Sequence, residues 1–286
     1  MAPSSSPTVR RRRLAADLHR LRQASKLTIE QVAESLEWSP GKVSKIENAR
    51  VSVMPRDVRR LLDLYGIAEG PERDLLLSLA RESRERGWWQ QYGDTVPEWF
   101  ATYVGLEAEA SAISVYQAEI VPGLLQTQGY ATALHRAELM NATEEEIEQR
   151  VAVRMERQAR LTEPDAPRLW VVLNEAVIRR VVGERAVMHG QLARLAESAS
   201  APNITLQVLP FSAGAHASMD SAFSIVSFDP PTDGDVVYFE HPTSSLYLER
   251  PQEVARYRLI YEHLRAASLS LDESRRLLTR SAEDLA

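Results

Sequence analysis

A short stretch of the chain, residues 28–48, places two amphipathic helices almost end to end. Its sequence is TIEQVAESLEWSPGKVSKIEN. Thr28 is a typical N-cap with Gln31 three residues later, as in a capping box, and Ser39 followed by Pro40 begins a second helix. Two short helices this close in sequence can cross only near a small side chain. The segment therefore has the layout of a helix-turn-helix, with Ala33 at the contact and an inner face of Val32, Leu36, Val43 and Ile46.

Three more helices are expected around this pair. Apolar residues at helical spacing predict one helix from about Val9 to Ala24, and Pro55 and Pro71 each stand where a helix begins. Five helices then form a compact domain at residues 9–86. The Ser- and Pro-rich residues 1–8 have no apolar face and are predicted to be a disordered tail.

Charge is divided unevenly along the chain, which has 34 Lys and Arg residues, 40 Asp and Glu residues and a net charge of -6. Residues 1–86 contain 17 basic and 12 acidic residues, a net charge of +5, whereas residues 87–286 contain 17 and 28, a net charge of -11. A basic end on an acidic body indicates an anionic partner for the basic end, most often nucleic acid. The alternative is a basic helix surface that is simply solvated.

Composition excludes several classes of protein. The absence of cysteine rules out disulfide scaffolds, thiol catalysis and cysteine-ligated zinc. No apolar run approaches the ~18 residues of a membrane-spanning helix, and the first residues lack the apolar core of a signal peptide. We therefore expect a soluble, cytoplasmic protein with no membrane partner.

Beyond residue 87 the pattern becomes α+β. A helical pattern runs from about Glu98 to Ala118, LWVVL at residues 169–173 is β-like, and turns such as Asp229–Gly234 join strand-like runs. The predicted fold class is mainly α: a five-helix helix-turn-helix domain, followed at residues 87–286 by an α+β domain with a small antiparallel sheet.

The helix that begins at Ser39 has an outward face suited to the major groove of DNA, which is about 12 Å wide. Thr28 begins the preceding helix, where free backbone amides can hold a phosphate. The residues expected on the outward face are Ser39, Pro40, Gly41, Lys42, Ser44 and Lys45.

Catalytic signals are weak. The six histidines are scattered, and neither H-E-x-x-H nor G-x-S-x-G occurs. His216 and Asp220 suggest a hydrolase, but a catalytic triad requires a geometry that closeness in sequence does not provide. We expect no enzyme, no metal and no cofactor.

Candidates for a partner or ligand surface are Trp88, Trp89, Pro122, Leu124, Leu125, Tyr130 and His216.

Residues 9 to about 66 resemble the Cro and phage-repressor type of helix-turn-helix, the xenobiotic-response-element family of bacterial regulators. The phrase KVSKIEN is the most specific part of the match. The resemblance implies that Arg22 pairs with Glu47. One departure is Glu37, which stands where the turn normally has glycine. The resemblance also implies binding of double-stranded DNA, with Asn48, Arg50 and Arg56 near backbone phosphates.

Residues 88 to about 280 resemble the uncharacterised domain that follows the helix-turn-helix in many regulators of mycelial high-GC bacteria. The segments WWQQYGDTVPEWF, RLWVVLNEAVIRRVVG and ITLQVLPFSAGAHASM carry this resemblance. The genes of such regulators often adjoin a gene for a small protein, in an arrangement likened to a toxin–antitoxin pair. The resemblance therefore implies a small protein partner.

Together these patterns predict a sequence-specific transcription regulator whose C-terminal domain binds a small protein partner or a ligand. A single recognition helix buries little surface, so we expect a homodimer that reads two half-sites. Two alternatives remain open. One is an antitoxin-like sequestering protein with autoregulatory DNA binding, and the other is a DNA-binding protein with an enzymatic C-terminal domain.

Overall fold

The structure is a computed structural model that describes residues 7–84, 87–229 and 234–286. The chain divides into two compact units, residues 1–90 and 91–286, each of which is described by itself. Three predicted features lie partly outside the described residues: the tail predicted at 1–8, the domain boundary predicted between residues 86 and 87, and the turn predicted at 229–234. The first helix begins at Pro7, two residues before the predicted start.

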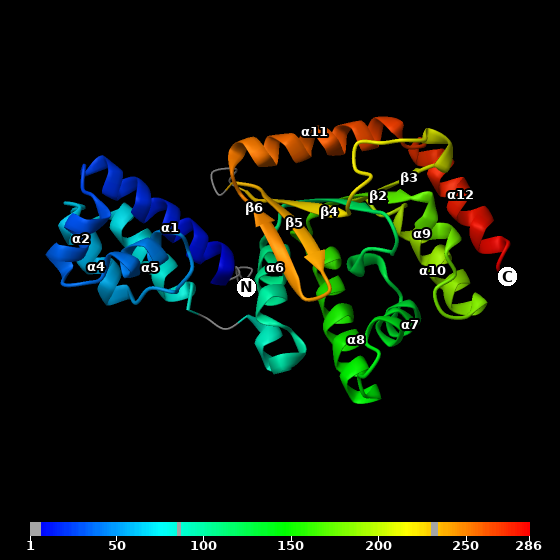
Figure 1. The fold of residues 1–286 in the computed structure, drawn as a ribbon, viewed down its shortest axis with the longest axis horizontal. Coiled ribbons are helices and arrows are strands. Elements are labelled where there is room, and N and C mark those ends of the chain that lie inside the picture. Colours follow the sequence, from blue (N-terminus) through cyan, green and yellow to red (C-terminus); the bar gives the residue numbers. More distant parts are fainter. Residues whose placement is uncertain (1–6, 85–86, 230–233) are drawn as a thin grey trace. The chain divides into compact units, whose positions relative to one another are not determined.

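In its described residues the first unit is helical (Figure 1). The apolar stripe of α1 packs with the inner faces of the next helices in one core, because each stripe alone would leave apolar surface in water. That core includes Leu14, Leu18 and Leu21 of α1 and also Val32, Leu36, Val43, Ile46, Val58 and Leu61. The helices are α1 (Pro7–Ala24), α2 (Ile29–Leu36), α3 (Pro40–Glu47), α4 (Pro55–Leu64) and α5 (Pro71–Glu82).

The second unit combines helices with one sheet. Its strands are β1 (Ala112–Gln117), β2 (Arg168–Asn174), β3 (Ile204–Leu209), β4 (Phe223–Ser227), β5 (Val236–His241) and β6 (Ser244–Leu248). Its α-helices are α6 (Glu98–Glu109), α7 (Gln128–Glu138), α8 (Glu144–Gln158), α9 (Glu175–Arg179), α10 (Arg185–Ser198), α11 (Pro251–Ala267) and α12 (Leu271–Glu283). Short 3-10 turns are η1 (Trp88–Thr95), which spans the division between the units, η2 (Gly123–Leu125), η3 (Ala159–Thr162) and η4 (Phe211–Ala213).

The prediction of a small antiparallel sheet is wrong. In the described residues of the second unit, six strands form one mixed sheet in the order β3-β2-β1-β4-β5-β6. β1, β2 and β3 pair in parallel, whereas β4, β5 and β6 pair antiparallel. Parallel neighbours need long crossover connections, and here α7 and α8 lie between β1 and β2 in the chain. The sequence thus indicated α7 and α8 as helices, but it did not indicate that they connect parallel strands.

The central strand was also mispredicted as helix. The helical pattern expected to reach Ala118 stops at α6, because the backbone of Ala110 turns to an extended conformation with φ -60° and ψ 136°. Ile113 is buried between the half-buried Ala112 and Ser114, and Val115 and Tyr116 are both buried on opposite faces, which suits a strand covered on both sides. β1 therefore occupies the middle of the sheet, paired with β2 on one side and β4 on the other.

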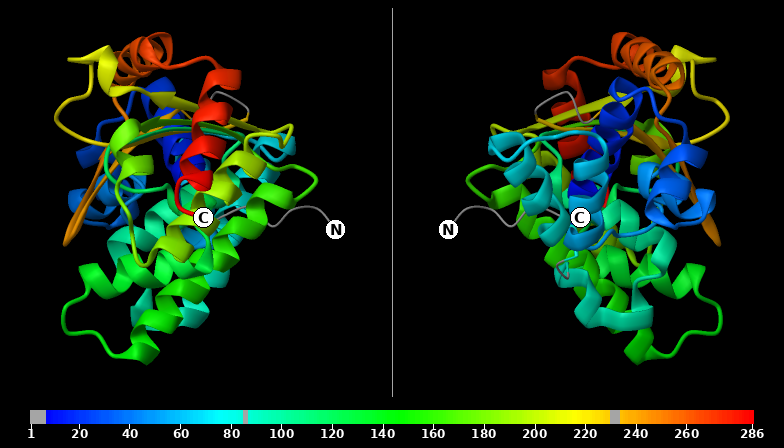
Figure 2. Two further views of the ribbon diagram at one scale, coloured as in Figure 1. Left: turned by 90° about the vertical axis from the view of Figure 1, so that its right-hand side faces the viewer. Right: turned by 90° about the vertical axis from the view of Figure 1, so that its left-hand side faces the viewer.

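Helices cover both faces of the sheet, which explains why its strands are apolar on both sides (Figures 1 and 2). On one face, α11 packs through Tyr261 and Leu264 against Phe223, Ile225 and Phe239. Since side chains alternate along a strand, their neighbours point to the opposite face, where α6 and α8 lie. That second face contains the pocket described below.

Candidate nucleic-acid interface and C-terminal pocket

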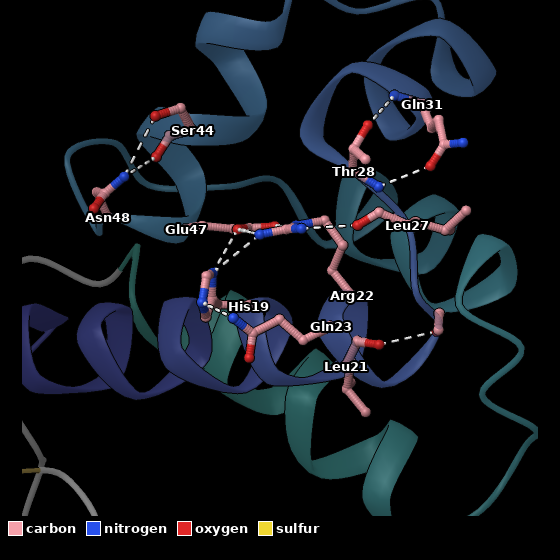
Figure 3. A network of polar contacts seen from close by, with 11 residues as sticks. His19, Leu21, Arg22, Gln23, Leu27, Thr28, Gln31, Ser44, Glu47 and Asn48 are labelled. Atoms are coloured by element: carbon pink, nitrogen blue, oxygen red, sulfur yellow. Dashed lines mark hydrogen bonds and ion pairs between the residues drawn. The ribbon is translucent and has the colours of Figure 1, made fainter.

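Side-chain caps define the beginnings of both helices in the helix-turn-helix. The hydroxyl of Thr28 accepts a hydrogen bond from the backbone N–H of Gln31 at 3.2 Å, and the Gln31 side chain accepts one from the N–H of Thr28 at 2.9 Å (Figure 3). Ser39 caps α3 in the same way by accepting from the N–H of Lys42 at 3.2 Å, with Pro40 in the first turn. These bonds satisfy amide groups that a helix start leaves free.

The turn between α2 and α3 adopts a left-handed backbone at Glu37, with φ 57° and ψ 41°. This is the position where glycine is usual, and a side chain there costs ~1 to 2 kcal/mol. Closure of the turn is helped by the N–H of Trp38, which donates to the carbonyl of Ala33 at 2.8 Å. The turn therefore keeps its shape although it lacks glycine.

The outward face of α3 is open to solvent at four of the predicted contact positions. Ser39, Pro40, Gly41 and Lys45 are exposed, while Val43 and Ile46 on the other side are buried in the core of the first unit. Lys42 and Ser44 are half-buried. Gly41 contributes no side chain, and its surroundings are open. The residues that α3 can offer to a ligand are therefore mainly those around Lys45.

Lys42 is less available than its position on α3 implies. Its Nζ atom lies 2.9 Å from Oδ2 of Asp57 and 3.6 Å from the ring centroid of Trp38. The carboxylate offsets the ammonium charge, and the indole holds it from the other side. Sequence reasoning missed Asp57, because this residue belongs to α4 and only the fold brings it next to α3. No ion pair of Lys45 is found among the described residues.

The end of α3 is tied to α1 by a buried ion pair, which the resemblance implied. Nε and Nη2 of Arg22 donate to the two carboxylate oxygens of Glu47 at 2.7 and 2.9 Å, and Nη1 donates to the carbonyl of Leu27 at 2.8 Å (Figure 3). The side chains are only 10% and 3% exposed. The hydrogen bonds to Glu47 raise the pKa of Arg22. His19 adds a contact, with Nδ1 2.8 Å from Oε2 of Glu47.

The side chains of the other predicted phosphate contacts differ in whether they are already bonded within the protein. The side-chain amide of Asn48 donates to the backbone carbonyl of Ser44 at 2.8 Å, so it also closes the end of α3. Arg50 is exposed. The side chain of Arg56 is 78% exposed, with Nε 3.9 Å from a carboxylate oxygen of Asp57. Both arginines can therefore extend toward a polyanion.

Most of the residues predicted as a partner surface are buried. Pro122, Leu124, Leu125 and Tyr130 lie in the interior, where the Tyr130 hydroxyl accepts a hydrogen bond from the N–H of Val121 at 3.2 Å. They do not form an open surface, but Pro122 and Leu124 also line the pocket described below.

The remaining members of that surface are partly or fully covered. Trp89 is buried, and Trp88 is half-buried and meets it edge to face at 5.9 Å. His216 is half-buried, with Nε2 3.3 Å from the hydroxyl of Tyr116 and Nδ1 accepting from the N–H of Ser218 at 3.3 Å. Burial lowers the pKa of His216. Among the described residues no group of three or more His, Asp or Glu is arranged to hold a metal ion.

A pocket of about 550 Å³ lies in the second unit, between the sheet and helices α6, α7 and α8. One wall is aromatic. Tyr103 of α6 stacks on Tyr238 of β5 with centroids 4.0 Å apart, and Phe100 stacks on Tyr103 at 5.9 Å. Trp99 meets Phe100 at 5.8 Å. Burial raises the pKa values of Tyr103 and Tyr238, so both phenols are neutral at ordinary pH.

The other wall carries arginines of α8. Nε and Nη2 of Arg157 donate to the two carboxylate oxygens of Glu107 at 2.7 and 2.8 Å, in a pair whose side chains are 7% and 3% exposed. Although burial opposes its charge, the charge of Glu107 raises the pKa of Arg157. Arg154 instead donates to the neutral Oε1 of Gln126 at 2.6 Å.

Of the residues predicted for a partner or ligand surface, Pro122 and Leu124 line this pocket, but its charged residues were missed although two signals were present. Arg150, Arg154 and Arg157 recur at helical spacing, so they share the face of α8 that lines the pocket. Glu107 stands at a buried position of α6, among apolar residues such as Val104 and Leu106. Charged residues on inward faces require partners, and this requirement could have marked the site.

Comparison with protein families agrees with the division into a helical unit and a sheet-containing unit. Residues 13–76 match a helix-turn-helix domain. The helix-turn-helix domain supports a DNA-binding transcription regulator. No curated protein and no solved structure matches the chain. Within the described residues, no helix combines the length and the apolar character needed to cross a membrane. Residues 100–280, more than half of the chain, match the domain of unknown function DUF5753, and the chain belongs to this family.

Proposed function

We propose that the protein is a sequence-specific transcription regulator that reads DNA bases with α3. The observation that carries this proposal is the exposed face of α3 around Lys45, on a helix whose other side is fixed in the core of the first unit. A lysine on a helix in the major groove can donate to the O6 and N7 acceptors of guanine. We also propose that the helix-turn-helix of this protein is of the xenobiotic-response-element type.

Phosphate contacts would position α3 without reading sequence. Arg50 and Arg56 supply exposed guanidinium groups beyond the end of α3 and at the start of α4. The first turn of α2, after Thr28, supplies backbone amides, one of which is already bonded to the Thr28 hydroxyl. Lys42 contributes less to either role, because Asp57 already holds its ammonium group.

The proposal includes a homodimer in the cytoplasm. The short α3 offers few side chains to bases, so two copies on two half-sites would supply the specificity that one copy lacks. The second unit is proposed to bind a ligand or a small protein encoded by a neighbouring gene and to adjust this pairing. An antitoxin-like role and a catalytic role of that unit were the alternatives, and no contact described above favours either.

The experiment that tests base reading is the substitution Lys45→Ala. A good base contact is worth ~1 to 3 kcal/mol, so the ratio of specific to non-specific affinity should fall about 5- to 150-fold. The ratio is measured by competition gel shift at fixed salt, on an operator selected from random DNA by the wild-type protein.

The matched control is Arg81→Ala, which removes one exposed positive charge from α5. This control should lower both affinities slightly and leave their ratio unchanged. If Lys45→Ala kept the wild-type ratio with an unaltered circular dichroism spectrum, α3 would not be the reading element.

A further inference from the structure

The two walls of the pocket in the second unit differ in chemistry. Trp99, Phe100 and Tyr103 from α6 offer flat apolar faces, and Leu124 and Leu139 extend the apolar lining. The opposite side is formed by α8 with its arginines. A volume of about 550 Å³ falls within the range of pockets that enclose small organic molecules. The lining therefore suits a molecule with an apolar body and a polar end.

Arg154 is the side chain that determines the charge of that polar end. Arg157 beside it is neutralised by the two-bond pair with Glu107. Arg154 has only the neutral Gln126 as a hydrogen-bond partner, and no carboxylate among the described side chains lies within ion-pair distance of it. Burial and the charge of Arg157 lower the pKa of Arg154 to about 10, which still leaves it cationic at neutral pH. The charges of Glu240, Glu138 and Glu107 offset part of this effect from a distance, but none of them forms an ion pair with Arg154. A desolvated cation without a direct ion-pair partner favours an anion.

Two other carboxylates limit how much negative charge the pocket accepts. Glu138 of α7 and Glu240 of β5 also line it, together with Arg150 of α8, so these three side chains add a net charge of -1. A group with two negative charges, such as a phosphate monoester, would be repelled by them more strongly than a carboxylate. The planar guanidinium group of Arg154 can donate hydrogen bonds to both oxygens of one carboxylate.

We propose that the pocket of the DUF5753 domain binds a monoanionic organic acid, with its carboxylate on Arg154 and its apolar body against the aromatic wall of α6. This inference rests on the proposed ligand-binding function of the second unit and names the class of ligand. It does not depend on which DNA sequence the first unit reads.

The test uses the full chain and three probes with carboxylates: 1-naphthaleneacetate, 4-phenylbutyrate and decanoate. Each is compared with its uncharged amide by isothermal titration calorimetry at neutral pH and low salt. At least one acid should bind about tenfold or more tightly than its amide, because a hydrogen bond to a charged group is lost with the amide. 1-Naphthyl phosphate should bind more weakly than 1-naphthaleneacetate.

The variant Arg154→Met should reduce the affinity of the acid to that of the amide and leave the amide unchanged. Arg136→Met is the control of equal charge, since Arg136 is an exposed residue of α7. It should preserve the difference between acid and amide.

The proposal is overturned if no acid binds at millimolar concentration, if acids and amides bind equally, or if Arg154→Met still distinguishes them. Tighter binding of the phosphate would overturn the choice of a monoanion. The wild-type comparison of acid with amide is decisive even if the variant folds poorly. Because no DNA is present, a negative result leaves base reading by Lys45 untouched, and a negative gel shift leaves the pocket untouched.

Discussion

The buried pair between Arg22 and Glu47 gives a quantitative prediction for the stability of the helix-turn-helix. Glu47→Ala removes the carboxylate and leaves the Arg22 guanidinium enclosed with two neutral partners, the carbonyl of Leu27 at 2.8 Å and Nδ1 of His19 at 3.3 Å. Removing one member of a buried ion pair typically costs ~3 to 5 kcal/mol, because the other charge remains desolvated. We expect the lower end, about 3 kcal/mol, since the Leu27 bond persists.

Native-state amide hydrogen exchange measures this loss within the intact chain. A cost of about 3 kcal/mol raises the population of open states roughly 100-fold, so exchange of protected amides in α1 and α3 should accelerate by that factor. Amides of β1 and β2 in the second unit serve as an internal reference and should not change. A double variant with Arg22→Met and Glu47→Leu should recover much of the protection, because it buries no charge.

A matched control comes from an ion pair at the surface. Arg136 and Glu144 lie 2.6 Å apart, but their side chains are 57% and 66% exposed. Glu144→Ala should therefore leave exchange in α7 nearly unchanged. If Glu47→Ala altered exchange in α1 and α3 less than twofold, the reasoning about burial would be refuted. If the double variant were as unprotected as the single one, lost packing would be responsible instead of the unpaired charge.

Two further predictions concern the turn and the dimer. Glu37→Gly should stabilise the first unit by about 0.5 to 1 kcal/mol in thermal unfolding, because relief of the left-handed strain exceeds the added entropy of the unfolded chain, whereas Glu37→Ala should bring no such gain. An operator with two half-sites should bind the protein about 100-fold or more tightly than one half-site in fluorescence anisotropy, since the second contact becomes intramolecular, and equal affinities would argue against the proposed homodimer.

The first unit was predictable because its signals are local. Caps such as Thr28 and Ser39 and apolar residues three or four apart act within a few residues, so the helices could be placed without knowing the fold. The availability of Lys42 could not be foreseen in the same way. Lys42 is on α3 and its partner Asp57 is on α4, so the contact depends on how α4 packs beside the helix-turn-helix.

The second unit was less predictable, because its sheet and its pocket depend on contacts between distant parts of the chain. Strand direction depends on which strands become neighbours, and the run LWVVL at residues 169–173 reads alike for a parallel or an antiparallel strand. Strand β1 was hidden because its alanine and preceding residues continue the helical pattern of α6. The polar side of the pocket escaped prediction because Glu107, Gln126 and Arg154 are separated in the chain and come to line one pocket only after folding.

The place of β1 in the sheet has a consequence for the order of folding. Ala112 pairs with Arg168 on β2 and with Ser227 on β4, so the middle strand forms its hydrogen bonds only after much later parts of the chain have been synthesised. Contacts this distant in sequence close large loops and slow the search for the native arrangement. The first unit completes its packing, including the contact of α1 with α5, within the first 90 residues, so it can form while the ribosome is still making the second. The apolar residues Ile113 and Val115 stay without their strand partners until then, which exposes this segment of the nascent protein to aggregation.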